Sequence, residues 1–170
     1  MRFYSGFSLK EESAFFEKYL KKSQYNVAGF SYGAIKAFEY VLTCKDRIDT
    51  LQLFSPAFFQ NRAEKFRRLQ LLAYGKDKEK YLQNFMASCF APYYKQNVSH
   101  VQTNQDELYE LLYYVWEIDK LQALTQRSIE IEVYVGEKDN IIDAQQTKDF
   151  FLPFATTYFI KDANHFLQTD

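Results

Sequence analysis

The chain has 170 residues, of which 47% are hydrophobic and 25% charged, and its formal net charge is −1. This composition is that of one folded globular domain and excludes an intrinsically disordered chain. Because the net charge is close to zero, the whole molecule has no electrostatic bias towards nucleic acid or a membrane, and we expect neither as a partner.

The first half of the chain alternates predicted strands with predicted helices. The aromatic-rich stretch 2–7 is a predicted strand that breaks at Gly6. Ser8, with Glu11 three residues later, fits a capping box, which predicts a helix from there to about Lys22. Three further elements follow: a strand over 25–30, a helix over 34–42 and a continuous apolar strand over 51–54.

The second half consists of a long helical block and a final strand, helix and strand. Residues 60–125 carry helical patterns with no strand signal among them, and we expect them to form a cap inserted before the last two strands. After this block come a strand over 129–135, a helix over 145–154 and a strand over 156–160. The alternation predicts an α/β fold, a mostly parallel sheet with flanking helices in a single domain 1–170.

Cysteine use and hydropathy indicate the compartment. Cys44 and Cys89 have no spacing typical of a metal site or a disulfide scaffold, which favours a reducing cytosol. The first residues lack the apolar stretch of a signal peptide, and the chain has no apolar run of about eighteen residues. The sequence therefore predicts a cytoplasmic protein with no membrane span, no metal site and no other cofactor.

The pentapeptide Gly29-Phe30-Ser31-Tyr32-Gly33 matches the pattern G-x-S-x-G at a predicted strand-to-helix turn. Only small residues fit two positions before and after a nucleophile on such a turn, and the following helix N-terminus favours negative charge. The bare pattern is weak, but the apolar strand before it and the helix after it favour a nucleophile elbow over an ordinary glycine turn. Ser31 is therefore the candidate nucleophile.

A serine nucleophile needs a base, usually histidine, and an acid that orients this base. His165 directly follows the last predicted strand and is the candidate base, whereas His100 lies inside the predicted cap and is expected to be a surface residue. Asp139 follows the strand over 129–135 and is the candidate acid, with Asp143 as the fallback.

An acyl-transfer site also needs N–H donors for the oxyanion. The amide of Tyr32, the residue after the nucleophile, is one candidate donor. The second should come from a loop after another strand of the sheet, and the Phe7 N–H in Ser5-Gly6-Phe7 is the candidate. The alternative is that Gly6 forms only a simple turn.

Three segments taken in order resemble the signatures of the α/β-hydrolase superfamily: 29–33, 136–139 and 163–165. Ser5-Gly6-Phe7 resembles the oxyanion loop of that superfamily, with Ser where a His is usual. The chain departs from the pattern at Asn164, where a Gly commonly precedes the catalytic His, and it lacks the two leading strands and the closing helix. The resemblance implies a reduced α/β-hydrolase fold with a Ser-Asp-His triad.

Within the superfamily, this compact form looks most like the pimeloyl-[acyl-carrier-protein] methyl ester esterases of biotin synthesis. That resemblance implies a serine carboxylesterase that hydrolyses the methyl ester of a carrier-bound pimeloyl chain through an acyl-enzyme on Ser31, with acyl carrier protein as partner. Residues 60–100 carry eight basic and three acidic side chains, and a basic helix over the pocket is suited to an acidic carrier. The candidate carrier-binding residues are Arg62, Lys65, Arg67 and Arg68.

Other hypotheses stay open from the sequence. The basic segment could instead pair with the acidic half of the cap, over 101–120, or form a solvated face. The functional alternatives are a carboxylesterase or thioesterase for free small acyl substrates, and a non-catalytic hydrolase-like domain that binds a ligand or a partner. The complete set Ser31, Asp139 and His165 argues against the non-catalytic domain, which has no need of it.

Overall fold

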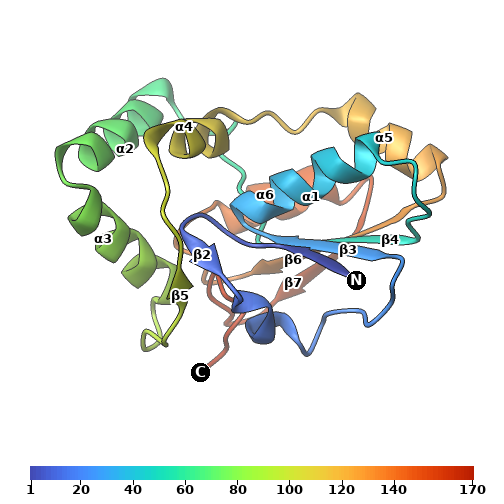
Figure 1. The fold of residues 1–170 in the computed structure, drawn as a ribbon, viewed down its shortest axis with the longest axis horizontal. Helices are drawn as coiled ribbons and strands as arrows, with labels where there is room; N and C mark the ends of the chain where they lie inside the picture. Colours follow the sequence, from blue (N-terminus) through green and yellow to red (C-terminus); the bar gives the residue numbers. More distant parts are fainter.

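A five-stranded parallel sheet lies at the centre of the computed structural model, which describes all 170 residues (Figure 1). The strand order is β1-β3-β4-β6-β7, and every neighbouring pair is parallel. The strands are β1 (Arg2–Tyr4), β3 (Asn26–Phe30), β4 (Thr50–Phe54), β6 (Glu130–Gly136) and β7 (Thr156–Ile160). The predicted α/β class with a mostly parallel sheet is confirmed.

Three helices cover one face of this sheet: α1 (Tyr32–Thr43), α5 (Ile118–Gln126) and α6 (Ala144–Phe151) (Figure 1). Successive strands are added in one direction along the sheet, and because parallel crossovers are right-handed, their helices fall on the same face. α1 packs on β3 and β4, α5 on β6 and α1, and α6 on β6 and β7. Because the strands are parallel, their carboxyl ends all lie at one edge of the sheet, and the loops that follow them meet there.

The segment between β1 and β3 covers the opposite face and contains the 3₁₀ helix η1 (Glu12–Phe16) (Figure 1). Phe30, Phe54 and Tyr134 are register partners on adjacent strands and form an aromatic row across this face. Phe16 is fully buried against the row, with its ring centroid 4.8 Å from that of Phe30 and 4.7 Å from that of Phe54. Burying these rings holds the N-terminal segment on the sheet.

The helix predicted from Ser8 to about Lys22 is wrong, and so is its capping box. Ser8 has a φ of 63° and precedes β2 (Leu9–Lys10), which pairs antiparallel with β5 (Ser99–His100). Only η1 is helical in this stretch. A partner strand about ninety residues away decides the conformation here, and local propensity does not report such a partner.

Polar contacts to the sheet explain why the chain after η1 is not helical. The Lys21 N–H donates to the Gln52 side chain on β4 at 2.9 Å. The Lys21 ammonium lies 2.7 Å from the buried carboxylate of Glu132 on β6. Both contacts hold this segment across the sheet as irregular chain, and the ammonium group offsets the charge of the buried Glu132 carboxylate.

The insertion between β4 and β6 begins with α2 (Glu64–Lys76) and α3 (Lys78–Phe90), followed by α4 (Gln105–Tyr113). These three helices lie together beyond the carboxyl ends of the strands (Figure 1), with α2 in contact with both α3 and α4. α5, although inside the range 60–125, packs on the sheet layer. The expectation of an uninterrupted helical block is wrong at β5, a strand too short to leave a pattern in the sequence.

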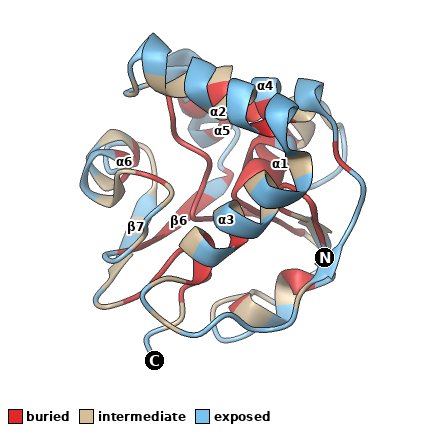
Figure 2. Cartoon of the chain, turned by 90° about the vertical axis from the view of Figure 1, so that its left-hand side faces the viewer, coloured by how far each residue is buried: buried red, intermediate tan, exposed pale blue.

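Burial is concentrated in the central strands β3, β4 and β6 and on the inner sides of the helices, while α3 is largely exposed or half-buried (Figure 2). Only Met86, Cys89 and Phe90 of α3 are buried, all at its C-terminal end. None of the helices combines the length and the apolarity that crossing a membrane requires.

Candidate active site

Ser31 stands on a sharp turn between β3 and α1, with φ 52° and ψ −113°. A non-glycine residue at positive φ stores backbone strain, as expected for a nucleophile elbow. Its N–H donates to the Phe54 carbonyl at 2.9 Å, which fixes the turn to β4. A Cβ on Gly29 would lie 2.2 Å from the Gly33 carbonyl oxygen, so the two glycines allow the strand and the helix to close around Ser31.

The three candidate triad residues form one hydrogen-bonded chain. His165 Nε2 lies 3.0 Å from Ser31 Oγ, and His165 Nδ1 lies 2.6 Å from Asp139 Oδ2. The His165 and Asp139 side chains are fully buried. Because the carboxylate accepts at Nδ1, that nitrogen carries the ring proton and Nε2 is left to accept the proton of the serine hydroxyl.

The acid is fixed by its own loop after β6. Asp139 Oδ1 accepts the N–H groups of Ile141 and Ile142 at 2.8 and 3.1 Å, which leaves Oδ2 for the histidine. Asp143, the fallback acid, instead caps α6 by accepting the Gln146 N–H at 2.9 Å. The structure therefore places Asp139, and not Asp143, against the imidazole.

The loop after β7 is held from two sides so that His165 reaches the serine. A Cβ on Gly136 would lie 2.4 Å from the carbonyl oxygens of Ala163 and Asn164, so this glycine allows the acid and histidine loops to pack together. The buried Ser55 hydroxyl donates to the His165 carbonyl at 2.8 Å. The sequence analysis did not single out Ser55, and the positive φ (41°) that aims it is not visible in the sequence.

Asn164 ties the histidine loop to the cap. Its amide donates to the Phe90 carbonyl at the end of α3 at 2.8 Å, and its side-chain oxygen accepts the Phe166 and Gln168 N–H groups, both at 3.0 Å. Asn164 is fully buried. The departure from the superfamily pattern at this position thus has a structural role that a glycine could not fill.

The two candidate oxyanion donors flank the serine elbow. No protein group accepts the N–H of Phe7 or of Tyr32. A Cβ on Gly33 would lie 2.0 Å from the Tyr4 carbonyl oxygen, so the loop that carries Phe7 packs directly on the first turn of α1. The arrangement leaves two unpaired main-chain donors on neighbouring segments, as an oxyanion site requires.

Glu12 shapes the candidate oxyanion loop and was missed by the sequence analysis. The residue is 2% exposed; its carboxylate Oε1 accepts the Gly6 N–H at 2.7 Å, while Oε2 has no hydrogen-bond partner. The Leu9 N–H donates to the Gly6 carbonyl at 3.1 Å, which closes a turn with Phe7 at its first corner. Gly6 therefore forms a turn and also positions the candidate donor, so the two alternatives for it are compatible.

The cap lines an open apolar cavity of about 340 Å³ beside the acid loop. Its walls come from α2, α3, α4 and the residues after Asp139, and they include Phe59, Phe66, Phe85, Leu108, Leu112 and Ile141. Tyr32 joins the elbow to this cap, because its hydroxyl donates to Glu110 on α4 at 2.5 Å. Burial and this hydrogen bond raise the pKa of Tyr32, which keeps the phenol protonated as a donor.

The four predicted basic residues of the cap have different surroundings. Arg62 lies over the Phe66 ring at 5.0 Å, and Arg67 lies over the Tyr113 ring at 4.8 Å and near Glu64. Lys65 and Arg68 are exposed on the outer face of α2 beside Leu69 and Leu72, which are also exposed. Only Lys65 and Arg68 of the four are therefore exposed, while Arg62 and Arg67 are half-buried on aromatic rings.

His100 takes no part in the triad. His100 is exposed on β5, and its Nδ1 lies 3.1 Å from the Ser8 carbonyl oxygen, away from the triad. No group of three or more potential metal-ligating side chains gathers in the structure.

The parallel sheet, the serine elbow after β3 and the acid and histidine loops after β6 and β7 define an α/β-hydrolase fold. No protein-family model matches the sequence, and no curated protein is significantly similar to it in sequence.

Solved structures match this fold over most of the chain. One is an esterase (EaEST) from Exiguobacterium antarcticum, with 15% identity, a TM-score of 0.60, and coverage of 82% of this chain and 59% of that one. Carboxylesterase CesB (YbfK) from Bacillus subtilis has 13% identity and a TM-score of 0.59, with coverage of 92% and 57%. A bromoperoxidase from Bacillus anthracis has 14% identity and a TM-score of 0.59, with coverage of 83% and 60%.

This chain therefore spans less than two thirds of the length of each of these three proteins. At such low identity the likeness establishes the fold, and the names of these proteins describe their own activities.

Proposed function

We propose that this chain is a serine carboxylesterase that hydrolyses the methyl ester of a carrier-bound pimeloyl chain through an acyl-enzyme on Ser31. The observation that carries the catalytic part is the chain of hydrogen bonds from Ser31 through His165 to Asp139, at 3.0 and 2.6 Å. An ester substrate is supported by the structural neighbours, which include proteins named as an esterase and a carboxylesterase.

Acylation begins when Ser31 Oγ attacks the carbonyl carbon of the ester and its proton moves to His165 Nε2. The negative charge on the carbonyl oxygen is held by the N–H groups of Phe7 and Tyr32, and the Asp139 carboxylate stabilises the imidazolium. When the carbonyl re-forms, the bond from carbon to the methoxy oxygen breaks. The methoxy group takes the proton from His165 and leaves as methanol.

Deacylation repeats these steps with water. His165 Nε2 takes a proton from a water molecule, whose oxygen attacks the acyl carbon. The same two N–H groups hold the second oxyanion. As this intermediate collapses, the proton on His165 returns to Ser31 Oγ and the acid is released.

Two features of the cap support a carrier-bound acyl chain. The apolar cavity of about 340 Å³ suits a methylene chain, since each buried methylene group contributes about 0.8 kcal/mol. Lys65 and Arg68, next to the exposed Leu69 and Leu72, offer a basic and apolar surface on α2. An acidic protein surface that carries the acyl chain would be complementary to it.

The test is hydrolysis of pimeloyl-carrier methyl ester beside a small nitrophenyl ester, with labelling by a fluorophosphonate probe. We expect the wild-type chain to release methanol from the carrier ester and to be labelled, and Ser31→Ala to do neither. Turnover by Ser31→Ala near the wild-type rate would contradict the catalytic assignment. Hydrolysis of the nitrophenyl ester alone would instead favour a carboxylesterase for free small acyl substrates.

A further inference from the structure

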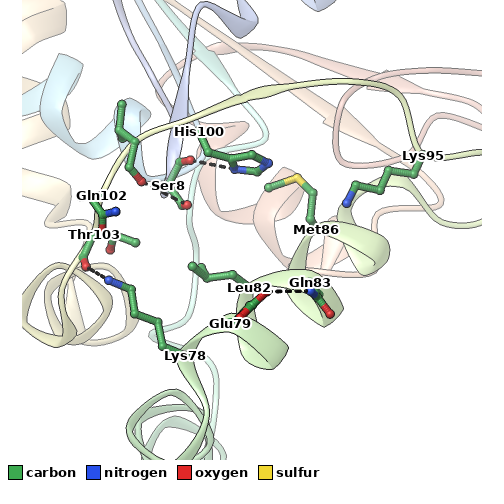
Figure 3. Close-up of a pocket in the computed structure, with 11 residues that line it drawn as sticks. Ser8, Lys78, Glu79, Leu82, Gln83, Met86, Lys95, His100, Gln102 and Thr103 are labelled. Carbon is green, nitrogen blue, oxygen red and sulfur yellow. Dashed lines mark hydrogen bonds between the residues drawn. The ribbon is translucent and has the colours of Figure 1, made fainter.

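Figure 3 shows a second cavity, of about 550 Å³. It lies on a different face of α3 from the apolar cavity. The apolar cavity takes Tyr81, Phe85 and Ser88 from α3, whereas this one takes Lys78, Leu82 and Met86. Helical periodicity puts these two sets of positions on different faces of the helix. The remaining wall comes from Ser8, from the loop after α3, and from β5 and the residues that follow it. We call it the α3–β5 pocket.

Two lysines in the α3–β5 pocket carry charge that no acid neutralises. Lys78 and Lys95 take part in none of the ion pairs of the structure. Lys78 rises from α3 and donates to the Thr103 carbonyl, and Lys95 reaches in from the loop after α3 (Figure 3). The one acid in the lining, Glu79, accepts instead from the amide of Gln83 on its own helix.

The floor of the α3–β5 pocket is apolar, and one wall adjoins the candidate oxyanion loop. Leu82 and Met86 form the floor between the two lysines (Figure 3). Ser8 directly follows Phe7, and its carbonyl oxygen lies 3.1 Å from His100 Nδ1. A ligand that fills this pocket therefore contacts the turn that positions the Phe7 N–H.

We propose that the α3–β5 pocket binds a phosphate group carried on a short, partly apolar chain. Ammonium groups act as point charges that suit the three oxygens of a phosphate approached from separate directions, whereas planar carboxylates are matched best by arginine, which this lining lacks. The apolar floor accounts for the chain. The proposal rests on the proposed function in one respect: we assign the phosphate to the acyl-bearing arm of the carrier, and a free phosphate ester is the other source of the same chemistry.

The binding test uses the full chain, butyl phosphate as the probe, and calorimetry at low ionic strength. We expect butyl phosphate to bind more tightly than butyrate, and 1-butanol to show no binding. Lys78→Gln and Lys95→Gln should each weaken butyl phosphate binding by about a factor of three to five, as for the loss of one exposed charge contact. Lys80→Gln is the matched control, because Lys80 is exposed on the same helix and lines neither cavity.

Equal weakening by Lys80→Gln and Lys95→Gln, or equal affinities for butyl phosphate and 1-butanol, would overturn the site. Steady-state kinetics test the assignment to the carrier arm. Lys95→Gln should raise KM for the carrier-bound ester by about a factor of three to five without changing kcat, and should leave the hydrolysis of a nitrophenyl ester unchanged. An unchanged KM beside weakened butyl phosphate binding would overturn the assignment to the carrier arm in favour of a free phosphate ester. Tight butyl phosphate binding by a chain that hydrolyses no ester would contradict the proposed function alone.

Discussion

Asn164 donates its side-chain N–H to the carbonyl of Phe90 at 2.8 Å, which links the residue before His165 to the last residue of α3. The rest of α3 has cavities on two of its faces and buries little. This contact therefore couples the position of the end of α3 to that of the loop that carries His165.

We predict that Asn164→Ala lowers both stability and turnover. The substitution leaves the N–H groups of Phe166 and Gln168 without partners and removes one of the two donors to the Phe90 carbonyl, which costs about 2–4 kcal/mol in the free energy of unfolding. Chemical denaturation and kcat on a nitrophenyl ester measure the two effects. Asn164→Asp keeps both acceptor contacts but loses the donors to the Phe90 carbonyl and the Gln168 side chain and buries a carboxylate, so it should be destabilised as well.

The reactivity of the Cys89 thiol gives a second measure of the contact between Asn164 and Phe90, because Cys89 is the neighbour of Phe90 in α3. Burial, together with the nearby Asp139 carboxylate, raises the pKa of the Cys89 thiol, so it stays protonated and unreactive in the folded protein. We expect an aromatic disulfide reagent at pH 8 to modify Cys44 rapidly and Cys89 slowly, and Asn164→Ala to speed the slow phase. Rapid modification of both thiols in the wild-type chain would contradict the packing of α3 described above.

Asp139→Asn should lower kcat by about four orders of magnitude, because an amide cannot stabilise the imidazolium that forms on His165. Asp143→Asn should leave kcat within about twofold, since asparagine is as good a helix cap as aspartate. Steady-state hydrolysis of a nitrophenyl ester measures both. If Asp143→Asn were the crippling change, the acid would be misassigned.

Glu12→Ala should lower kcat about tenfold or more while KM changes little. Removing the acceptor of the Gly6 N–H frees the turn that presents the Phe7 N–H, and loss of one oxyanion donor costs about a hundredfold or more. Glu12→Gln keeps one side-chain oxygen for Gly6 and should restore most of the activity. Glu11→Gln, on the exposed neighbour, is the control and should behave as the wild type. Losses of kcat that only follow losses of stability in Glu12→Ala and Glu12→Gln, with Glu11→Gln unchanged, would mean that Glu12 supports only the fold.

Reversing the two exposed charges of α2, Lys65→Glu with Arg68→Glu, should raise KM for the carrier-bound ester about tenfold. Such contacts steer the encounter, so the effect should shrink as salt is added. The control is Lys18→Glu with Lys45→Glu, which makes the same change in net charge at exposed positions outside the cap. Both double variants should hydrolyse a nitrophenyl ester at the wild-type rate. Equal effects of the two on KM for the carrier-bound ester would mean that α2 has no specific role in carrier binding.

The strands and the helix around the serine could be predicted because their signals are local. Buried parallel strands are short apolar runs, and α1 shows its core-facing side as a repeat of three and four residues. The segment 9–22 could not be predicted in this way, because its partners are β5 and the polar side chains of β4 and β6. The same limit applies to the basic residues of α2, where only the packing shows that Arg62 and Arg67 lie on aromatic rings.

By itself, the sequence determined the fold class and the order in which the nucleophile, the acid and the histidine follow successive strands. These features depend on short motifs and on the rule that parallel strands end at one edge of the sheet. Only the tertiary structure decided which of two aspartates faces His165, that Glu12 holds the Gly6 turn, and that Asn164 reaches α3. The contacts of His165 and Asn164 join residues far apart in the chain, and the Glu12 contact depends on a turn that local propensity does not encode. Their geometry therefore exists only once the sheet and the cap have packed.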